Sequence, residues 1–456
     1  MGKTGLEAPD KAVRKYLAGY AEDEINLVDE TRAQAPRFAH GLTIPCHAEG
    51  EGVEACLASV PKGDRGNVLV VLVVNAPADA SEKIRASNAL TLERIRLAYG
   101  SPRSLSASAL LYPHPAGALL VIDRSTRIPL PRRQGVGLAR KIGADLLLAL
   151  AEDGQLDSPW IHCSDADAIL PSDYFQQVGG ASARGAAALL YRFRHVADGD
   201  PRQHEAALQY EISLRYYVLG LRFAGSPYAF HSIGSTLAVQ AGAYARVRGF
   251  PRREAAEDFY LLNKLAKVGD VRNLSGDPLR LSSRSSFRVP FGTGAAVGRL
   301  LEAPDPVLST YDPRVFHGLR CWLRVLEAAL EHSEARLDLR GRVLEGARLD
   351  AGIEGEQLIR GLEETGAFEL AEAALAEPGA NRGKRLLDAF DGFRTLKLIH
   401  ALRDTGLDNL PLGEALQRAE FMSSAPKVLA ASTVELAQEV GALDEAGGSF
   451  GRLAKS

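Results

Sequence analysis

The chain has 456 residues, with 54 Lys and Arg against 57 Asp and Glu and a formal net charge of −3. This near-neutral balance predicts no basic surface of the kind that nucleic-acid-binding domains carry. The apolar runs, such as 68–74, are far shorter than the ~20 residues that cross a bilayer, and the first ten residues lack the apolar core of a signal peptide. The four cysteines have no Cys-x-x-Cys spacing, which argues against a zinc site and a disulfide framework. We therefore expect a cytoplasmic protein without a transmembrane segment.

The first half of the chain alternates predicted strands and helices. Residues 1–39 are charged and helix-prone and predict a leader helix that packs on the domain after it. Short apolar runs predict strands at 42–44, 68–74, 118–122, 160–164, 187–190 and 235–239. Apolar residues at helical spacing predict helices at 53–60, 90–97, 137–150 and 204–219. This alternation predicts a doubly wound α/β domain over residues 40–300, with ligands beyond the carboxyl ends of its strands.

The pattern changes after about Leu301. A proline-rich linker follows, and no further strand signals occur. Phe316 and Leu386 each begin a stretch of apolar residues at helical spacing. We therefore predict an all-helical C-terminal domain over 301–456, which is also a candidate surface for homo-oligomerisation.

The most informative stretch is Asp165-Ala166-Asp167, directly after the predicted strand that begins at Trp160. Two acids at the end of a buried strand repel each other and lose hydration, so they need a compensating cation or donor. Mg²⁺ commonly binds through one or two carboxylates together with substrate phosphates. The pair therefore predicts a Mg²⁺ or Mn²⁺ site for a diphosphate. An acidic turn is the alternative, because Asp is common in turns.

Three further motifs stand in a fixed order around this pair. The first strand ends in Pro45-Cys46-His47-Ala48-Glu49, and a predicted helix begins with 135–143 one element before the acids. Glu257-Asp258 opens another helix shortly after Gly249-Phe250-Pro251. Strand ends of a doubly wound sheet meet at one edge, so we expect the first motif to lie beside the Asp pair.

In this order the motifs resemble those of the family 2 glycosyltransferases, which have the GT-A fold. That family combines a strand ending in Pro-x-x-Asn/Ala-Glu, an Ala-Arg-Asn-x-Gly helix start, an Asp-x-Asp strand end and a Gly-Phe…Glu-Asp helix. The resemblance covers residues 40–275 and implies a mixed, mostly parallel sheet with helices on both faces. His47 departs from the Tyr of many members, and Asn75 replaces the Asp that in many members reads the nucleobase. The Gln-x-x-Arg-Trp motif of processive synthases is absent, so a non-processive enzyme is expected.

The resemblance implies a site for a nucleoside diphosphate sugar. Asp167 would bind the divalent metal, and Asp165 would accept from the ribose hydroxyls or from a metal-bound water. Arg140 and Lys141 would meet the phosphate oxygens, with a solvated charged helix face as the alternative for both.

The nucleoside itself would lie against the ends of the first two predicted strands. Pro45, His47 and Glu49 would line its slot, and Asn75 would lie beside the base. Glu49 also has an alternative role as an acid at the start of a helix, where the helix dipole favours negative charge.

The acceptor side depends on Asp258, the expected general base. With an ordinary pKa near 4, this carboxylate is ionised at neutral pH and takes a proton from an attacking hydroxyl, which gives inversion at the anomeric carbon. Glu257, Gly234 and His231 are candidate contacts of the donor sugar or the acceptor. The alternatives are helix-dipole acids at 257–258 and a hydrogen-bonded structural histidine at 231.

A basic, glycine-rich stretch follows at Arg284–Gly294. Guanidinium groups and backbone amides suit a diphosphate, so Arg284 and Arg288 are candidate phosphate ligands on a lid. An interdomain linker is the alternative. For His317, packing on a helix face is favoured over a role at the metal.

The expected function is transfer of a hexose from a nucleoside diphosphate sugar to a hydroxyl acceptor. A nucleotidyltransferase is one alternative, but it would need a glycine- and Arg/Lys-rich loop after the first strand, where residues 45–49 are acidic. A non-catalytic nucleotide-sugar-binding or scaffold protein is the other. Asp165, Asp167 and Asp258 argue against it, because a decayed site would not retain all three acids. The base, sugar and acceptor are not specified, and retention at the anomeric carbon stays an alternative because inversion depends on Asp258 alone.

Overall fold

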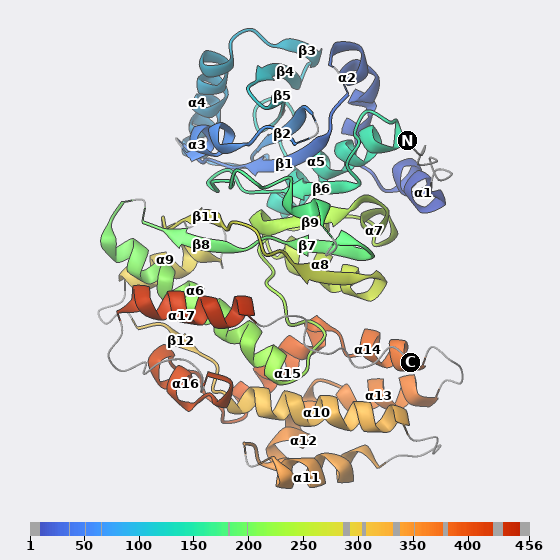
Figure 1. Cartoon of the computed structure of the whole chain (residues 1–456), viewed down its shortest axis with the longest axis vertical. Helices are drawn as coiled ribbons and strands as arrows, with labels where there is room; N and C mark the ends of the chain where they lie inside the picture. The colour runs from blue at the N-terminus through green and yellow to red at the C-terminus, as the bar shows by residue number, and fades with distance from the viewer. Residues whose placement is uncertain are drawn as a thin grey trace. The chain divides into compact units, whose positions relative to one another are not determined.

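A computed structural model of the chain divides it into two compact units (Figure 1). The described residues are 10–35, 37–50, 52–64, 66–180, 183–197, 199–285, 292–302, 307–331, 338–350, 352–376, 382–422 and 432–446. The first unit comprises Met1–Val196, Ser232–Ser282 and Arg288–Phe291, and the second comprises Ala197–His231, Ser283–Phe287 and Gly292–Ser456. The second unit therefore includes the predicted helix at 204–219, which the sequence-based boundary placed in the first domain.

The first unit is built on a nine-stranded sheet in the order β10-β7-β9-β6-β1-β2-β5-β4-β3. The strands are β1 His40–Cys46, β2 Val68–Asn75, β3 Arg103–Ser106, β4 Ala109–His114, β5 Gly117–Arg124, β6 Trp160–Cys163, β7 Ala186–Leu190, β9 Leu237–Gln240 and β10 Asp270–Asn273. Only β4 and β9 run against the other seven. The sheet is mostly parallel and consistent with a GT-A-like fold, so the predicted fold class is confirmed.

All six predicted strands are present. Of the sheet strands that were missed, β3 and β10 have few apolar residues, whereas β4 contains the apolar run 109–112 and was still not predicted. β3 exposes most of its residues, and the residues of β10 are partly exposed or exposed. Two more short strands, β8 (Phe193–Val196) and β11 (Leu279–Ser282), form a separate parallel pair in this unit. Exposed and short strands give weak periodicity, which is why the sequence did not reveal them.

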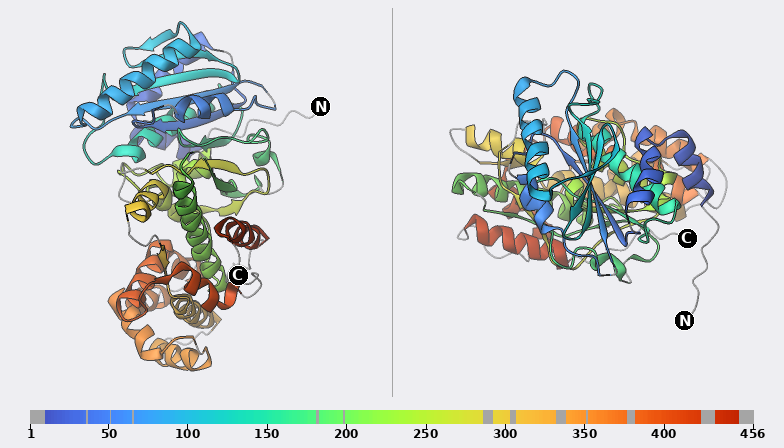
Figure 2. Two further views of the ribbon diagram at one scale, coloured as in Figure 1. Left: turned by 90° about the vertical axis from the view of Figure 1, so that its left-hand side faces the viewer. Right: turned by 90° about the horizontal axis from the view of Figure 1, so that it is seen from above.

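Helices cover both faces of the sheet, as Figure 2 shows for α4 (Glu82–Tyr99) and α5 (Gly135–Glu152). Successive residues of β1 point to opposite faces. Leu42 and Ile44 belong to the apolar core that includes α3 (Gly52–Ser59). Thr43, between them, faces α5, because a Cβ built on Gly143 of that helix would lie 2.0 Å from its Oγ1.

The N-terminal segment forms two helices rather than the single predicted leader helix. These are α1 (Lys11–Gly19) and α2 (Val28–Gln34), joined by a 3₁₀ turn at Asp23–Leu27. The Tyr16 hydroxyl donates to Asp145 of α5 at 2.6 Å, and both side chains are buried. The segment is therefore part of the first unit and packs on α5.

In its described residues, the second unit is helical apart from a two-residue strand pair, β12 (Ser309–Thr310) with β13 (Leu410–Pro411). Its helices are α6 Pro201–Phe223, α9 Thr293–Glu302, α10 Arg314–Glu331, α11 Leu339–Leu349, α12 Gly355–Glu364, α13 Ala367–Ala376, α14 Arg382–Ala389, α15 Gly392–Asp404, α16 Leu412–Arg418 and α17 Thr433–Ala446. Tyr216 of α6 packs edge-on against Phe316 of α10 at 5.7 Å between ring centroids. Contacts of this kind assign α6 to the helical unit.

Within the described ranges, no helix combines the length and the apolar character needed to cross a membrane.

Candidate active site

The ends of β1 and β2 are joined by side chains at the edge of the sheet where the site was predicted. His47 Nδ1 lies 2.8 Å from the backbone oxygen of Asn75, so this nitrogen carries the hydrogen. Asn88 of α4 links the same two segments, because its Nδ2 donates to Asn75 O (2.9 Å) and its Oδ1 accepts from the N–H of Ala48 (2.8 Å). Asn88 is fully buried and was not singled out in the sequence, where a polar residue within a helix has no distinctive signal.

The Asp pair lies beside the loop that follows β1. The Cys56 thiol of α3 donates to the backbone oxygen of Asp165 at 3.3 Å, and the Ser59 hydroxyl accepts from the N–H of Leu170 at 3.0 Å. A Cβ on Gly52, the first residue of α3, would lie 3.7 Å from Cβ of Asp167. The segment from Pro45, which is buried, to half-buried Glu49 leads into this helix. The predicted nucleoside slot and the Asp pair are therefore neighbours.

Arg140 of α5 connects the Asp pair to the Glu257-Asp258 motif. Its guanidinium donates to Asp165 Oδ1 at 2.8 Å and to Glu257 Oε1 at 3.0 Å. It also donates to the backbone oxygen of Gly234 at 3.0 Å, and only 2 % of Arg140 is exposed. A buried guanidinium with two carboxylate partners is fully used by the protein, so Arg140 organises the site rather than presenting a solvated charge. Glu257 and Gly234 likewise serve to hold Arg140.

Asp258 lies at the start of α8 (Glu257–Val268), next to Glu257, and is partly exposed. Burial by the surrounding protein raises its pKa to about 7, with a further increase from the charge of Glu257 and opposing effects from Arg140 and the Phe259 N–H. This corrects the expectation of an ordinary pKa near 4. A general base whose pKa is close to the working pH is well matched to proton transfer.

The backbone is strained on both sides of this site. Ala256, immediately before Glu257, has φ +60°, and Ala48, immediately after His47, has φ +53°. L-residues rarely adopt this left-handed conformation, and such strain clusters at functional sites. The two strained residues are direct neighbours of the candidate site residues His47 and Glu257.

The first turn of α5 contacts the loop before α8 so closely that a side chain is excluded. A Cβ on Gly137 would lie 2.4 Å from the backbone oxygen of Pro251 and 2.7 Å from the backbone of Arg253. The Gly137 N–H donates to the Arg253 oxygen at 2.9 Å. The absence of a side chain at this position therefore sets the distance between Arg140 and the acids of α8.

Gly137→Ala is expected to lower the free energy of unfolding by about 1–3 kcal/mol, because backbone atoms on both sides cannot move apart cheaply. Urea unfolding followed by circular dichroism measures this change. Gly19→Ala is the matched control, since a Cβ there meets nothing within 4 Å. Equal stability of the Gly137 variant and the control would contradict the close packing.

Lys141, predicted to meet phosphate, lies elsewhere. Its ammonium donates to Asp145 Oδ2 at 2.7 Å and to the Tyr16 hydroxyl, and only 4 % of the residue is exposed. The Tyr244 hydroxyl donates to the same carboxylate at 2.8 Å. Since α5 turns by about 100° per residue, Arg140 and Lys141 face different surroundings. Lys141 stabilises the docking of α1 and is not among the residues gathered around Arg140.

His231 belongs to the second unit, where its Nε2 lies 2.8 Å from Asp444 Oδ2 of α17. Arg215 and Arg222 of α6 also pair with Asp444, each at 2.8 Å. All four residues are buried. His231 is therefore the hydrogen-bonded structural histidine of the alternative interpretation, within an ion cluster that joins α6 to α17.

Asp444→Ala is expected to destabilise the second unit by about 3–5 kcal/mol, because it leaves three buried basic groups without their shared carboxylate. Burial alone would raise the pKa of Asp444, but His231, Arg222 and Arg215 lower it to about 2. A lowered pKa means that the carboxylate stabilises the fold above pH 4 and loses this effect as the pH falls towards 2.

Urea unfolding at pH 7 and at pH 2.5 should therefore show a larger effect of Asp444→Ala at pH 7. The exposed Asp404, paired with its neighbour Arg403, provides the control substitution Asp404→Ala. A loss of stability that is the same at both pH values would contradict the ion-cluster explanation.

The predicted lid is only partly described. Arg284 is half-buried and belongs to the second unit. Arg288 and the rest of 286–291 lie outside the described residues, as does Glu51. His317 is also in the second unit, on α10, where its Nδ1 lies 2.6 Å from Asp350 Oδ1.

The residues of the Asp pair fit a divalent metal that takes its remaining ligands from a diphosphate and water. Asp165 and Asp167 are both partly exposed at the strand end, while Ala166 between them is fully buried. Their oxygen-only donor set suits Mg²⁺ or Mn²⁺. No group of three or more His, Cys, Asp or Glu side chains suited to a metal occurs in the part of the chain that the structure describes. The metal would therefore depend on the substrate for its full coordination.

No protein-family model matches the chain, and no curated protein matches it. Among solved structures, it is similar to residues 1–349 of TarS from S. aureus, at 13% identity over 81% of this chain and 88% of that chain, with a TM-score of 0.34. The complex of the same protein with UDP gives 13% identity over 81% and 90%, with a TM-score of 0.34. A mannosyltransferase from Pyrobaculum calidifontis, in complex with GDP-Man and Mn²⁺, shares 15% identity over 88% of this chain and 99% of that chain, with a TM-score of 0.33. At these scores the similarity supports no functional conclusion, which therefore depends on the side chains.

Proposed function

We propose that the first unit is a metal-dependent, inverting and non-processive glycosyltransferase of the family 2 type. It moves a hexose from a nucleoside diphosphate sugar to a hydroxyl acceptor. The observation that supports this most is Arg140, whose buried guanidinium bridges Asp165 and Glu257. This bridge connects the Asp pair, the proposed metal ligands, to the Glu257-Asp258 motif, which contains the proposed general base. The Asp pair follows a strand at the edge where ligands of doubly wound folds bind.

The donor would lie across the ends of β1, β2 and β6. Asp167 and Asp165 would hold a divalent metal, which would supply positive charge to the diphosphate leaving group. His47, hydrogen-bonded to the backbone of Asn75, would position the nucleoside. The side-chain Oδ1 of Asn75 is buried and has no hydrogen-bond partner among the described residues. Because an unpaired buried acceptor is unfavourable, a donor group of the nucleobase is a suitable partner for it.

Asp258 would take the proton of the acceptor hydroxyl as that oxygen attacks the anomeric carbon. The bond to the diphosphate oxygen breaks in the same displacement, so the configuration of the sugar inverts. Arg140 holds Glu257 beside Asp258, and the charge of Glu257 raises the pKa of Asp258, which strengthens it as a base.

The test is an assay of the whole chain with a panel of nucleotide sugars and Mn²⁺. Thermal shift identifies the donor, since a ligand at 100 times its Kd adds about 2.7 kcal/mol to the stability. We expect release of nucleoside diphosphate and a product of inverted anomeric configuration by NMR. Release of pyrophosphate would identify a nucleotidyltransferase instead. If the chain binds a nucleotide sugar but transfers no sugar to a broad set of hydroxyl acceptors or to water, a non-catalytic role would be favoured.

A further inference from the structure

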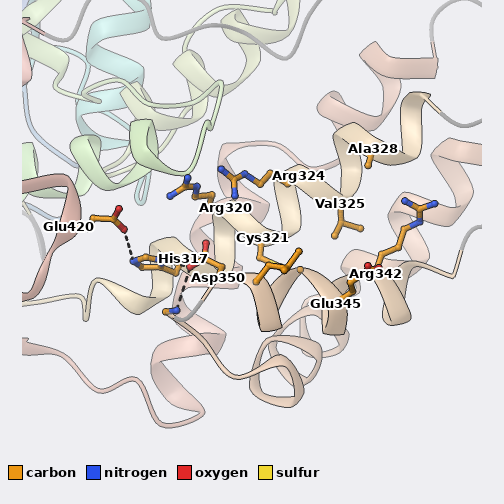
Figure 3. A pocket seen from close by; sticks show the side chains of 13 residues that line it. His317, Arg320, Cys321, Arg324, Val325, Ala328, Arg342, Glu345, Asp350 and Glu420 are labelled. Atoms are coloured by element: carbon orange, nitrogen blue, oxygen red, sulfur yellow. Dashed lines mark hydrogen bonds and ion pairs between the residues drawn. The ribbon is translucent and has the colours of Figure 1, made fainter.

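The second unit contains a cavity of about 700 Å³ between α10 and α11, with Glu420 at one end (Figure 3). This volume lies within the range of small-molecule sites, about 300–1,000 Å³. The cavity lies within the helical unit, and none of the residues proposed for glycosyl transfer lines it.

Each helix contributes one face to the cavity. The α10 face carries residues at helical spacing from His317 through Cys321 and Arg324 to Ala328, and α11 contributes residues from Arg342 onwards. Two glycines allow close approach at its floor. A Cβ on Gly346 would lie 2.9 Å from the sulfur of Cys321, and one on Gly352 would lie 2.3 Å from the ring of His317.

At the acidic end of the cavity, Asp350 and Glu420 both lie near His317. His317 Nδ1 lies 2.6 Å from Asp350 Oδ1, and its Nε2 lies 3.9 Å from Glu420 Oε2 (Figure 3). These two carboxylates therefore face the imidazole, and neither forms an ion pair with an arginine that the structure describes.

The remaining charge of the cavity is mainly positive. Arg320, Arg324 and Arg342 line it, and none of the three forms an ion pair with another described residue. Arg320 is held in place by the ring of Phe223, with its Cζ 4.4 Å from the ring centroid. Glu345 is the one lining carboxylate that does not contact His317. The whole lining carries three guanidinium groups and three carboxylates, two of which, Asp350 and Glu420, gather at His317. Beside the arginines an anion is therefore favoured, and the planar guanidinium fits phosphate and carboxylate with two hydrogen bonds.

The cavity lining also includes an exposed apolar side chain. Leu349, at the end of α11, is 85 % exposed, which is a high value for a large apolar side chain. Val325 also lines the cavity but is itself buried. A ligand with an alkyl portion next to its anionic group would cover Leu349.

Cys321 does not suggest covalent chemistry. Burial raises the pKa of its thiol to about 11, and the charge of Asp350 adds to this while Arg324 opposes it. A thiol that stays protonated at neutral pH is a poor nucleophile. The chemistry of the cavity is therefore that of a binding site.

We propose that the groove between α10 and α11 binds an amphipathic anion, a phosphate or carboxylate group attached to an alkyl chain. The guanidinium groups of Arg320, Arg324 and Arg342 contact the anionic group, and Leu349 contacts the chain. This site is separate from the donor site and does not depend on the proposed glycosyl transfer.

Isothermal titration calorimetry of the full chain with octyl phosphate, octanoate and inorganic phosphate tests this site. Octyl phosphate should bind more tightly than inorganic phosphate, and its binding should weaken with added NaCl. Arg324→Gln should weaken binding by about ten-fold or more, since a hydrogen bond to a charged group is lost. Glu345→Gln should strengthen it, because the opposing carboxylate charge is removed.

Two variants separate the site from general surface charge. Arg348→Gln is the matched control, because Arg348 is exposed on α11 and does not line the cavity. Leu349→Ser should weaken the binding of octyl phosphate and leave that of inorganic phosphate unchanged. Undetectable binding of octyl phosphate at millimolar concentration would overturn the proposal, as would equal losses in the Arg324 and Arg348 variants.

Sedimentation with phosphatidylcholine vesicles that contain phosphatidylglycerol identifies the source of the anion. Arg324-dependent sedimentation indicates a lipid headgroup, and its absence alongside octyl phosphate binding indicates a soluble ligand. Asp167→Asn should leave all of these results unchanged, so failure of the donor site and failure of this site are distinguishable.

Discussion

Asp258→Asn is expected to lower kcat by about 10²–10⁴-fold, the effect typical of a lost general base. The amide has nearly the shape of the carboxylate but cannot accept the proton of the attacking hydroxyl. The Kd of the donor should stay nearly constant, because Arg140 and the Asp pair retain their mutual contacts. The measurement is kcat beside donor Kd by calorimetry for the same variant. Glu254→Gln, which changes an exposed acid four residues earlier, is the control and should retain kcat.

The pH dependence of the wild-type protein provides a second measurement of the same base. Since the pKa of Asp258 is raised to about 7, kcat/KM should fall as the pH decreases below 7, by about ten-fold per unit once the base is mostly protonated. A profile that stays flat down to pH 5, or a near-normal kcat in Asp258→Asn, would reduce Asp258 to a structural acid at a helix start and would remove the ground for inversion.

The contribution of the Asp258 carboxyl group to the stability of the fold depends on pH in the opposite sense to the contribution of Asp444. A carboxyl group whose folded pKa exceeds the ordinary value of 3.8 binds its proton more tightly in the folded state. Its contribution to stability is therefore present at low pH and is lost as the pH rises towards 7. Without metal, Asp258→Asn should gain stability relative to the wild type between pH 4 and pH 8, as measured by urea unfolding in EDTA.

Asp167→Asn is expected to abolish turnover and metal-dependent donor binding while preserving the fold. Replacing one of two adjacent carboxylates removes both a metal ligand and the repulsion from Asp165, so the free energy of unfolding should hold or rise. The stabilisation of about 2.7 kcal/mol that donor and Mn²⁺ give the wild type at 100 times Kd should disappear. Thermal unfolding with nucleoside diphosphate, with and without Mn²⁺, measures the stability of the variant and its metal-dependent binding.

Asp157→Asn is the matched control for this variant. Asp157 precedes the same strand, β6, at its amino end, away from the edge where the carboxyl ends meet. This variant should respond to donor and Mn²⁺ as the wild type does. Full activity of Asp167→Asn, or of the wild type in excess EDTA, would eliminate the metal role of the pair.

The sequence by itself determined the α/β architecture and the edge of the sheet where the candidate site lies. β2 contains an apolar run, 68–74, that is buried along its whole length, and such a run is characteristic of a parallel strand covered on both faces. β1 is equally buried, although it includes His40 and Thr43. The acids that follow β6 were found for the same reason, since a charge directly after a buried strand contrasts with its surroundings. The change to a helical C-terminal region followed from the change of apolar period.

Only the tertiary structure decided what the charged side chains contact. Arg140 and Lys141 are adjacent in the sequence, yet one bridges Asp165 and Glu257 while the other stabilises the docking of α1. His231 likewise finds Asp444, more than two hundred residues away. The period of a helix or strand specifies the face on which a residue lies, but the partner comes from a distant segment that the local pattern does not contain. Burial then decides the chemistry, as it does in raising the pKa of Asp258, because desolvation depends on every segment packed around the group.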